Sequence, residues 1–302
     1  SPRWSPAGDQ IAFISNHEGN TSLWLINAFD GKQQRVKSSQ LQYLKPRKTF
    51  TITIHDEAGN QVPSRVSITD GNGKFYAAVN SWIHADDSRY PNQRRYEAHY
   101  FHSVGYETLE LPEGRITIQV SRGPEYELLK QEVDLSQLSS PDINITLKKQ
   151  DLPAYFGRWQ SGDLHVHMNY GGTYLNTPPI LSRQAEAENL NYVFNLIVNK
   201  EQRIPDVVYF TPTPFNYSIN TKILHAQEFH TSFWGHLGLL NLNEHFITPD
   251  YSGYPKTAVE SLFPHNSFIA DRAHDQQGLV GYVHPFEQSE VLPEQSLTLF
   301  NE

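Results

Sequence analysis

Alternating apolar and polar residues dominate the first half of the chain. Between residues 43 and 150 the alternating stretches are TFTITIHD, SRVSITD, GKFYAAVN, GRITIQVSRG and INITLKK, and Gly, Asn and Asp lie between them. Because successive side chains of a strand point to opposite faces, each stretch makes one apolar and one polar face. We therefore expect an all-β sandwich over residues 43–150.

The pattern changes after residue 151, where apolar runs alternate with helix-forming stretches. The strand candidates are DLHVH, YVFNLIV, HLGLLNL and GLVGYVHPF, and the helix candidates are PPILSRQAEAENLN and NSFIADRAHDQQ. Strands that alternate with helices predict a parallel sheet or an α/β barrel over residues 151–302, with functional side chains at the carboxyl ends of the strands. The whole chain is then expected to be a multidomain α+β protein.

The first 42 residues contain two short strand candidates, QIAFIS and SLWLIN, separated by the turn-rich NHEGNT. The pattern P-x-W-S-P-x-G-x-x-I-A-F, formed by Pro2, Trp4, Ser5, Pro6, Gly8, Ile11, Ala12 and Phe13, resembles the blade repeat of TolB-type β-propellers. A blade buries its faces against neighbouring blades, so the resemblance implies that residues 1–42 are a blade remnant cut from a longer protein. The alternative is an N-terminal hairpin packed on the next domain.

The composition limits the partners and the chemistry. With 24 Lys and Arg against 33 Asp and Glu, the formal charge of −9 disfavours a surface for nucleic acid or an anionic membrane. No stretch approaches the roughly 20 apolar residues that span a bilayer. The chain has no cysteine, so any metal must be bound by His, Asp or Glu. A small-molecule partner is expected, and the oligomeric state stays open.

Two histidines stand one residue apart in the stretch SGDLHVHMNYGG. In a strand, His165 and His167 point to the same face and can reach one metal ion. The alternative is a pair of histidines satisfied by hydrogen bonds. Further donors are available in Glu228, in His236 at the start of an apolar strand, and in His284 next to Pro285. His230 either orients Glu228 or is solvated.

These motifs together resemble the PHP superfamily, and more closely the CehA/McbA-type metallohydrolases. The matching stretches are GDLHVHMNYGG, RQAEAENLNYVFNLIVNK, QEFHTSFWGHLGLLNL and GLVGYVHPF. The resemblance implies a distorted TIM-type barrel in which His165 and His167 bind one metal ion, Glu228 bridges, and His236 with His284 binds a second. Zinc suits such ligands best, with manganese or iron as alternatives.

Two departures from the family limit what the resemblance implies. A Thr-Asp-His motif is common at the end of the second strand, but this chain has Asn199 and Lys200 there, so one or two ions are expected rather than three. The family's last metal motif, which contains an Asp, is expected beyond Glu302. The PHP-like domain, residues 151–302, is then an incomplete barrel of about four parallel strands, and this fragment is expected to bind metal weakly and to turn over slowly.

Two functions compete. The first is a metal-dependent hydrolase that uses a metal-activated water on a carbamate, amide, ester or phosphoester; its general acid and base cannot be assigned. The second is a ligand-binding or scaffold protein with a structural or degenerate metal site, and the two differ in whether the metal keeps an open coordination position. GNQVPSRVSITD and LPEGRITIQVSRGPEYE resemble the carboxypeptidase regulatory-like and carbohydrate-binding-like sandwiches of secreted hydrolases, which favours a periplasmic or secreted location.

Overall fold

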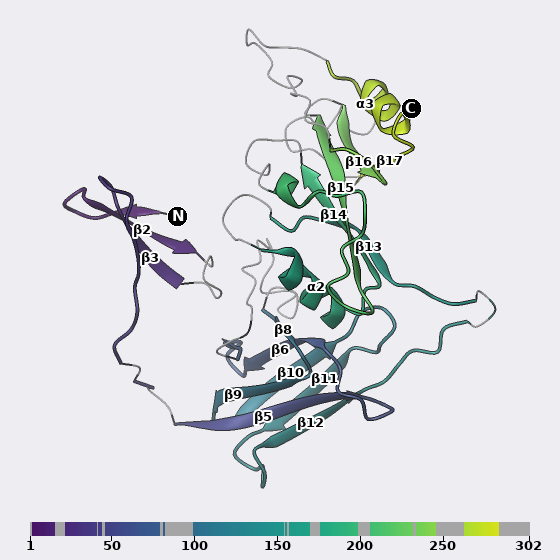
Figure 1. Cartoon of the computed structure of the whole chain (residues 1–302). Helices are drawn as coiled ribbons and strands as arrows, with labels where there is room; N and C mark the ends of the chain where they lie inside the picture. Colours follow the sequence, from purple (N-terminus) through teal and green to yellow (C-terminus); the bar gives the residue numbers. More distant parts are fainter. Residues whose placement is uncertain are drawn as a thin grey trace. The chain divides into compact units, whose positions relative to one another are not determined.

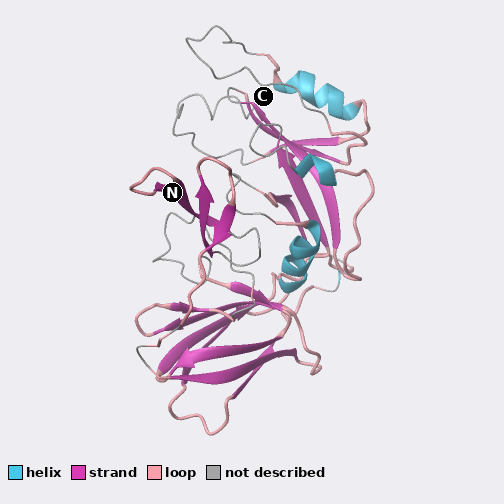
Figure 2. Ribbon diagram, turned by 60° about the vertical axis from the view of Figure 1, so that its left-hand side comes forward, coloured by secondary structure: helices cyan, strands magenta, loops and turns pink. Residues whose placement is uncertain are grey.

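Strands dominate this computed structural model (Figure 2). It describes residues 2–15, 22–40, 42–43, 46–78, 81, 99–153, 155, 157–169, 176–198, 206–231, 234–245 and 263–283. The helices in these ranges are α2 (Pro178–Ala187) and α3 (Asn266–His274), and neither has the length and apolar character needed to cross a membrane. The chain divides into two compact units, Ser1–Ser161 with Arg183–Leu190, and Gly162–Ser182 with Asn191–Glu302.

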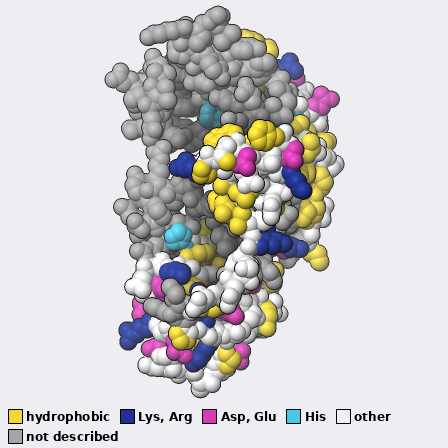
Figure 3. Space-filling view, turned by 90° about the vertical axis from the view of Figure 1, so that its left-hand side faces the viewer, with side chains coloured by type: hydrophobic (Ala, Val, Ile, Leu, Met, Phe, Trp, Pro, Cys, Tyr) yellow, Lys and Arg dark blue, Asp and Glu magenta, His cyan; other side chains and the backbone are white. Residues whose placement is uncertain are grey.

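The first unit begins with a four-stranded antiparallel sheet. Its strands, in spatial order, are β1 (Arg3–Trp4), β2 (Gln10–Ser15), β3 (Ser22–Asn27) and β4 (Gln33–Arg35). The predicted strands QIAFIS and SLWLIN coincide with β2 and β3. Trp24 is buried, whereas Trp4 and Phe29 are 64% and 84% exposed, and apolar side chains lie among charged ones on the face shown in Figure 3. That this sheet is a propeller blade stays a prediction.

Two further sheets of the first unit pack face to face as a β-sandwich. One has the order β11-β10-β6-β7 with β8 also paired to β6, and the other has the order β12-β5-β9. The strands are β5 (Arg47–Asp56), β6 (Ser64–Asp70), β7 (Phe75–Tyr76), β8 (Phe101–Ser103), β9 (Tyr106–Pro112), β10 (Arg115–Ser121), β11 (Leu129–Asp134) and β12 (Asp142–Leu147). Ile54, Ile118 and Leu147 illustrate the alternation that builds the core, since each is fully buried between less buried neighbours.

The end of α2 belongs to this first unit and is held there by charged groups. Arg65 Nε donates to Glu188 Oε1 at 2.5 Å, and His102 Nε2 lies 2.8 Å from the same oxygen. Burial alone would raise the pKa of Glu188, but the hydrogen bond and charge of His102, together with those of Arg65, outweigh it and lower the pKa. Gly123 packs so closely here that a Cβ would lie 2.1 Å from the Glu188 carbonyl oxygen.

The second unit is built on one five-stranded sheet with the order β13-β14-β15-β16-β17 (Figure 1). The strands are β13 (Gly162–Val166), β14 (Tyr192–Val198), β15 (Lys222–Thr231), β16 (Gly235–Leu240) and β17 (Leu279–Tyr282). The pairs β13–β14 and β14–β15 are parallel, whereas β15–β16 and β16–β17 are antiparallel. The sheet is therefore mixed and open.

The predicted fold class, with its truncated α/β barrel of about four parallel strands, is wrong. In the described part of the chain, three neighbouring strands run parallel and the next two turn back. Only residues 232–234 separate β15 from β16, and so short a connection makes an antiparallel hairpin, because a parallel crossover needs a dozen residues or more. A parallel barrel requires a crossover after every strand.

The two faces of this sheet differ in character. Phe229, Leu237 and Leu239 point to the face that packs against Ile269 and Ala273 of α3, and together they form the apolar core of the unit. Because side chains alternate along a strand, Glu228 and His230 of β15 and His236 of β16 point to the opposite face. Glu228, His230 and His236 thus share the face that α3 does not cover.

Candidate metal centre

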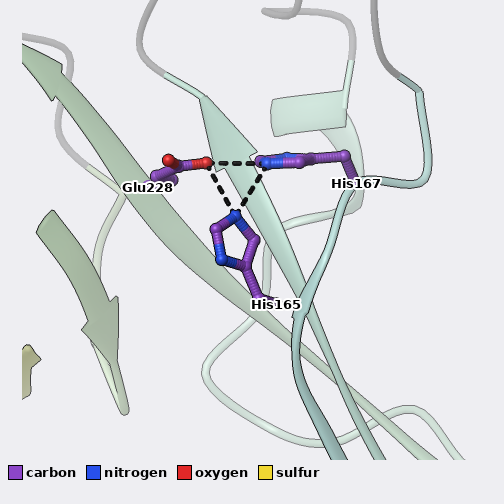
Figure 4. Close-up of side chains that lie close together, drawn as sticks. All are labelled: His165, His167 and Glu228. Carbon is purple, nitrogen blue, oxygen red and sulfur yellow. Dashed lines mark hydrogen bonds and ion pairs between the residues drawn. The ribbon is translucent and has the colours of Figure 1, made fainter. Parts of the chain in front are cut away.

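Three side chains converge from two strands that are not neighbours. His165 lies in β13, His167 follows it, and Glu228 comes from β15, with β14 between. The Nε2 atoms of His165 and His167 lie 3.2 and 2.7 Å from Glu228 Oε2 and 3.2 Å from each other (Figure 4). This triangle of two nitrogens and one oxygen is one of two groups in the described part of the chain that could hold a metal ion.

The hydrogen bond at Nδ1 of His167 determines whether its Nε2 is a donor or an acceptor. Nδ1 lies 2.9 Å from the carbonyl oxygen of Leu196, and since that oxygen only accepts, Nδ1 carries the proton. In the neutral ring Nε2 is then an acceptor that faces the carboxylate oxygen of Glu228 at 2.7 Å. Two lone pairs at this distance repel each other unless a proton or a metal ion lies between them.

The dimensions of the triangle suit a small ion. In a tetrahedral zinc site with ligands at about 2.0–2.1 Å, neighbouring ligand atoms are about 3.3–3.4 Å apart. Two of the three edges, both 3.2 Å, are close to that value, and the third, from His167 Nε2 to Glu228 Oε2, is shorter at 2.7 Å. The ring planes of His165 and His167 cross at 77°, so both in-plane lone pairs can point at one centre. His165, His167 and Glu228 could therefore bind one ion without large rearrangement.

A second group surrounds the other oxygen of Glu228. His230 Nε2 and His236 Nδ1 each lie 3.1 Å from Glu228 Oε1, and these three residues also could hold a metal ion. Their rings, however, are stacked with centroids 3.7 Å apart and planes only 8° from parallel. Parallel rings cannot both direct an in-plane lone pair at the same point, so this group needs one ring to turn before both histidines bind an ion.

Glu228 is held as a carboxylate by these imidazoles. Its side chain is 1% exposed, and burial alone would raise its pKa. Hydrogen bonds from His167, His230 and His236 and the charge of His230 outweigh burial and lower the pKa of Glu228 far below its ordinary value. The buried negative charge is the strongest attraction that the site offers to a cation.

Buried polar groups also hold the chain immediately after His167. The N–H of Met168 donates to Asn195 Oδ1 at 2.9 Å, and the N–H of Asn169 donates to Asp206 Oδ2 at 3.2 Å. Asn169 Nδ2 donates to Asp206 Oδ1 at 2.6 Å. Burial raises the pKa of Asp206, while its hydrogen bonds from Asn169 and the charge of His167 act in the opposite direction.

The structure brings together four of the five residues predicted as metal ligands: His165, His167, Glu228 and His236. The fifth, His284, lies outside the described residues, as do Asn199 and Lys200. That these residues bind one or two ions stays a prediction. The sequence interpretation did not identify Asn195 or Asp206, and left the role of His230 open. Short sequence patterns carry little sign of Asn195 and Asp206, because their contacts with Met168 and Asn169 are made across 27 and 37 positions of the chain.

Comparisons with known proteins do not place the chain in a family. No family model matches it, and no curated protein matches it. Among solved structures, the backbone protein of the group B streptococcus pilus 2b is 16% identical over 49% of this chain and 52% of that chain, with a TM-score of 0.25. The shaft pilin spaA from Lactobacillus rhamnosus GG is 12% identical over 50% of this chain and 70% of that chain, also at 0.25. BcpA, the major pilin subunit of Bacillus cereus, is 15% identical over 48% of this chain and 39% of that chain, at 0.22.

The predicted membership of the PHP superfamily, of the CehA/McbA type, is wrong. No family model supports it, and the described sheet is mixed rather than an α/β barrel. The predicted metal-dependent hydrolase activity rested on that membership and is wrong with it. The pilin likeness, at TM-scores of 0.25 or less, assigns no function to this chain. This chain spans about half of the streptococcal protein, 52% of its length.

Proposed function

We propose that this chain is a ligand-binding or scaffold protein in which a metal ion stabilises the second unit. The convergence of His165, His167 and Glu228 on one point carries the proposal. The two imidazole nitrogens and one carboxylate oxygen favour zinc, with manganese or iron as alternatives, over calcium, which takes six to eight oxygen ligands.

The position of the ligands suggests what the ion does for the fold. β13 is the edge strand of the sheet, and Leu164 in it is 59% exposed. An edge strand with few buried side chains gains little from packing. An ion bound by His165, His167 and Glu228 would tie this edge strand across β14 to β15. Binding to the folded chain alone would then stabilise the unit by mass action.

A ligand-binding role is supported by the number of metal ligands in this group, which is three. A tetrahedral ion held by three protein atoms leaves one position for water or for a donor atom of a bound ligand. The side chain of His165 is 34% exposed, which puts this group within reach of solvent. The small-molecule partner expected from the sequence would bind there.

The test is metal binding by the purified chain. We expect zinc to bind and to raise the midpoint of thermal unfolding, and Glu228→Gln to abolish both effects because the amide carries no negative charge. Glu244→Gln is the matched control, since Glu244 is exposed and lies in the same unit. A wild-type chain that binds no divalent metal would contradict the proposal. So would zinc-dependent hydrolysis of an aryl ester that Glu228→Gln abolishes, because a scaffold site turns nothing over.

A further inference from the structure

The chain is poorly fixed by the sheet ladder at the point where it presents His167. The register between β13 and β14 shifts between Asp163 and Val166, and the last paired residues are Val166 and Asn195. His167 therefore follows an irregular piece of ladder and lies beyond its end. Some other interaction must hold its backbone and its ring.

Beyond the end of the ladder, two buried side chains form hydrogen bonds with the backbone. Asn195 is fully buried and accepts from the N–H of Met168. Asp206 is 4% exposed and accepts from both the backbone and the side chain of Asn169. The two N–H groups that follow His167 along the chain are thus both bound by buried oxygens.

The ring of His167 is held from the same strand that supplies Asn195. Its Nδ1 donates to the carbonyl oxygen of Leu196, the residue after Asn195. Buried polar side chains are costly to the fold unless they are bonded, so Asn195 and Asp206 tolerate only a narrow range of positions for residues 168 and 169. The backbone bonds and the ring bond together leave Nε2 pointing at Glu228.

We propose that Asn195 and Asp206 are positioning residues for the metal ion, although neither touches it. They hold the segment after β13 so that His167 enters the site already oriented, which lowers the cost of ordering that ligand when the ion binds. Groups that orient a metal ligand in this way typically change metal affinity by about 10–100-fold. This inference rests on the proposed function, because it presumes that His165, His167 and Glu228 bind an ion.

The experiment compares Asp206→Asn and Asn195→Ala with the wild-type full chain. Asp206→Asn keeps the size of the side chain but places an amide N–H₂ against one of the two donors of Asn169. Asn195→Ala removes the acceptor for the Met168 N–H. We expect each variant to bind zinc about 10–100-fold more weakly at unchanged stoichiometry. We also expect the visible absorption of the cobalt-loaded protein to shift, because a displaced His167 changes the coordination geometry.

The matched control is Ile269→Val, which removes one methylene from the apolar core on the other face of the same sheet. It should lower the stability of the unit without changing zinc affinity or the cobalt spectrum. If Asp206→Asn and Asn195→Ala bind zinc as tightly as the wild type, or if Ile269→Val loses as much affinity as they do, the positioning role is overturned and the metal site stands. If the wild type itself binds no metal, the proposed function fails and this inference fails with it.

Discussion

Glu228 shows how one buried residue can organise a site. Four imidazoles lie within 3.2 Å of its two oxygens, two on each oxygen. A buried carboxylate is tolerated only when such partners compensate for lost water. His165 and His167 cross at 77°, whereas His230 and His236 are stacked 8° from parallel, so the two oxygens are not equivalent. The group at Oε2 could hold an ion with its rings as they stand, whereas the group at Oε1 needs one ring to turn.

His225 carries a pH prediction at the residue scale. Burial lowers the pKa of His225 from 6.5 to about 4, and its Nδ1 accepts from Asn195 Nδ2 at 3.1 Å. As the pH falls from about 6.5 to 4, the unfolded chain binds a proton that the folded chain does not, so the free energy of unfolding must fall. We expect His225→Gln to lose less stability than the wild type over this range, measured by urea unfolding with chelator present. Equal pH dependence of the two proteins would contradict the buried neutral imidazole.

The histidines also show which features of the site the sequence pattern can predict. Alternation along DLHVH predicts that His165 and His167 share a face, and their Nε2 atoms indeed lie 3.2 Å apart. The burial of His225 could not be predicted in this way. Its ring lies against Tyr209 and Phe215, which precede β15 along the chain, and no local pattern states that they fold back over it.

Close packing against the end of α2 gives a prediction at the scale of elements. Gly123 follows β10, has a φ of +62°, and approaches the Glu188 carbonyl, where a Cβ would lie 2.1 Å from the oxygen. Gly114 precedes β10, has a φ of +112°, and has open space around its Cβ position. Alanine at either site costs about 1–3 kcal/mol for the backbone conformation. We expect Gly123→Ala to cost at least about 1 kcal/mol more than Gly114→Ala, because the clash is added.

Chemical denaturation of the two glycine variants measures this difference. Equal losses of stability would mean that the end of α2 moves aside at little cost. The bonds from Arg65 and His102 to Glu188 oppose such a movement, since both would have to break or follow. Gly114→Ala isolates the conformational cost, because open space surrounds its Cβ position.

The elements differ in how well the sequence predicts them. β2, β3 and β14 are apolar or cleanly alternating, and their bounds follow from the pattern. The ten-residue strand β15, KILHAQEFHT, was not predicted as a strand, because His225, Gln227, Glu228 and His230 interrupt its apolar residues. These polar side chains are buried within 0–5% exposure. The apolar–polar alternation of β15 therefore cannot be recognised in the sequence, because polar residues occupy positions that are buried.

Missing β15 changes the prediction for the whole molecule. Without it, the apolar run of β16 looks like the next parallel strand after β14, and a barrel is predicted. With it, the short link to β16 makes a hairpin, and the sheet turns antiparallel. The β-sandwich is less sensitive to such errors. Its sheets, antiparallel except for the β5–β12 pair, are built from many strands that each show the alternating pattern. The error therefore falls in the unit that carries the candidate site.

The two units have separate apolar cores, and this gives the prediction at the scale of the whole molecule. One core lies inside the β-sandwich and the other beneath α3, while the candidate metal ligands belong only to the second unit. Zinc at 100 times its Kd would stabilise the second unit by about 2.7 kcal/mol, or roughly 5–10 °C for a domain of this size. We expect calorimetry of the full chain to show two unfolding transitions. Chelator should lower the midpoint temperature of one transition by roughly 5–10 °C and leave the midpoint of the other unchanged.

A core variant identifies which transition is which. Ile118 is fully buried in the sandwich, and Ile118→Val should cost about 0.5–1.5 kcal/mol there. Ile118→Val should lower the midpoint temperature of the transition that chelator does not affect. In this variant, chelator should still lower the midpoint temperature of the other transition. If chelator and Ile118→Val lower the same single transition, the units unfold as one body. The ion then stabilises the sandwich too, through residues that are not its ligands.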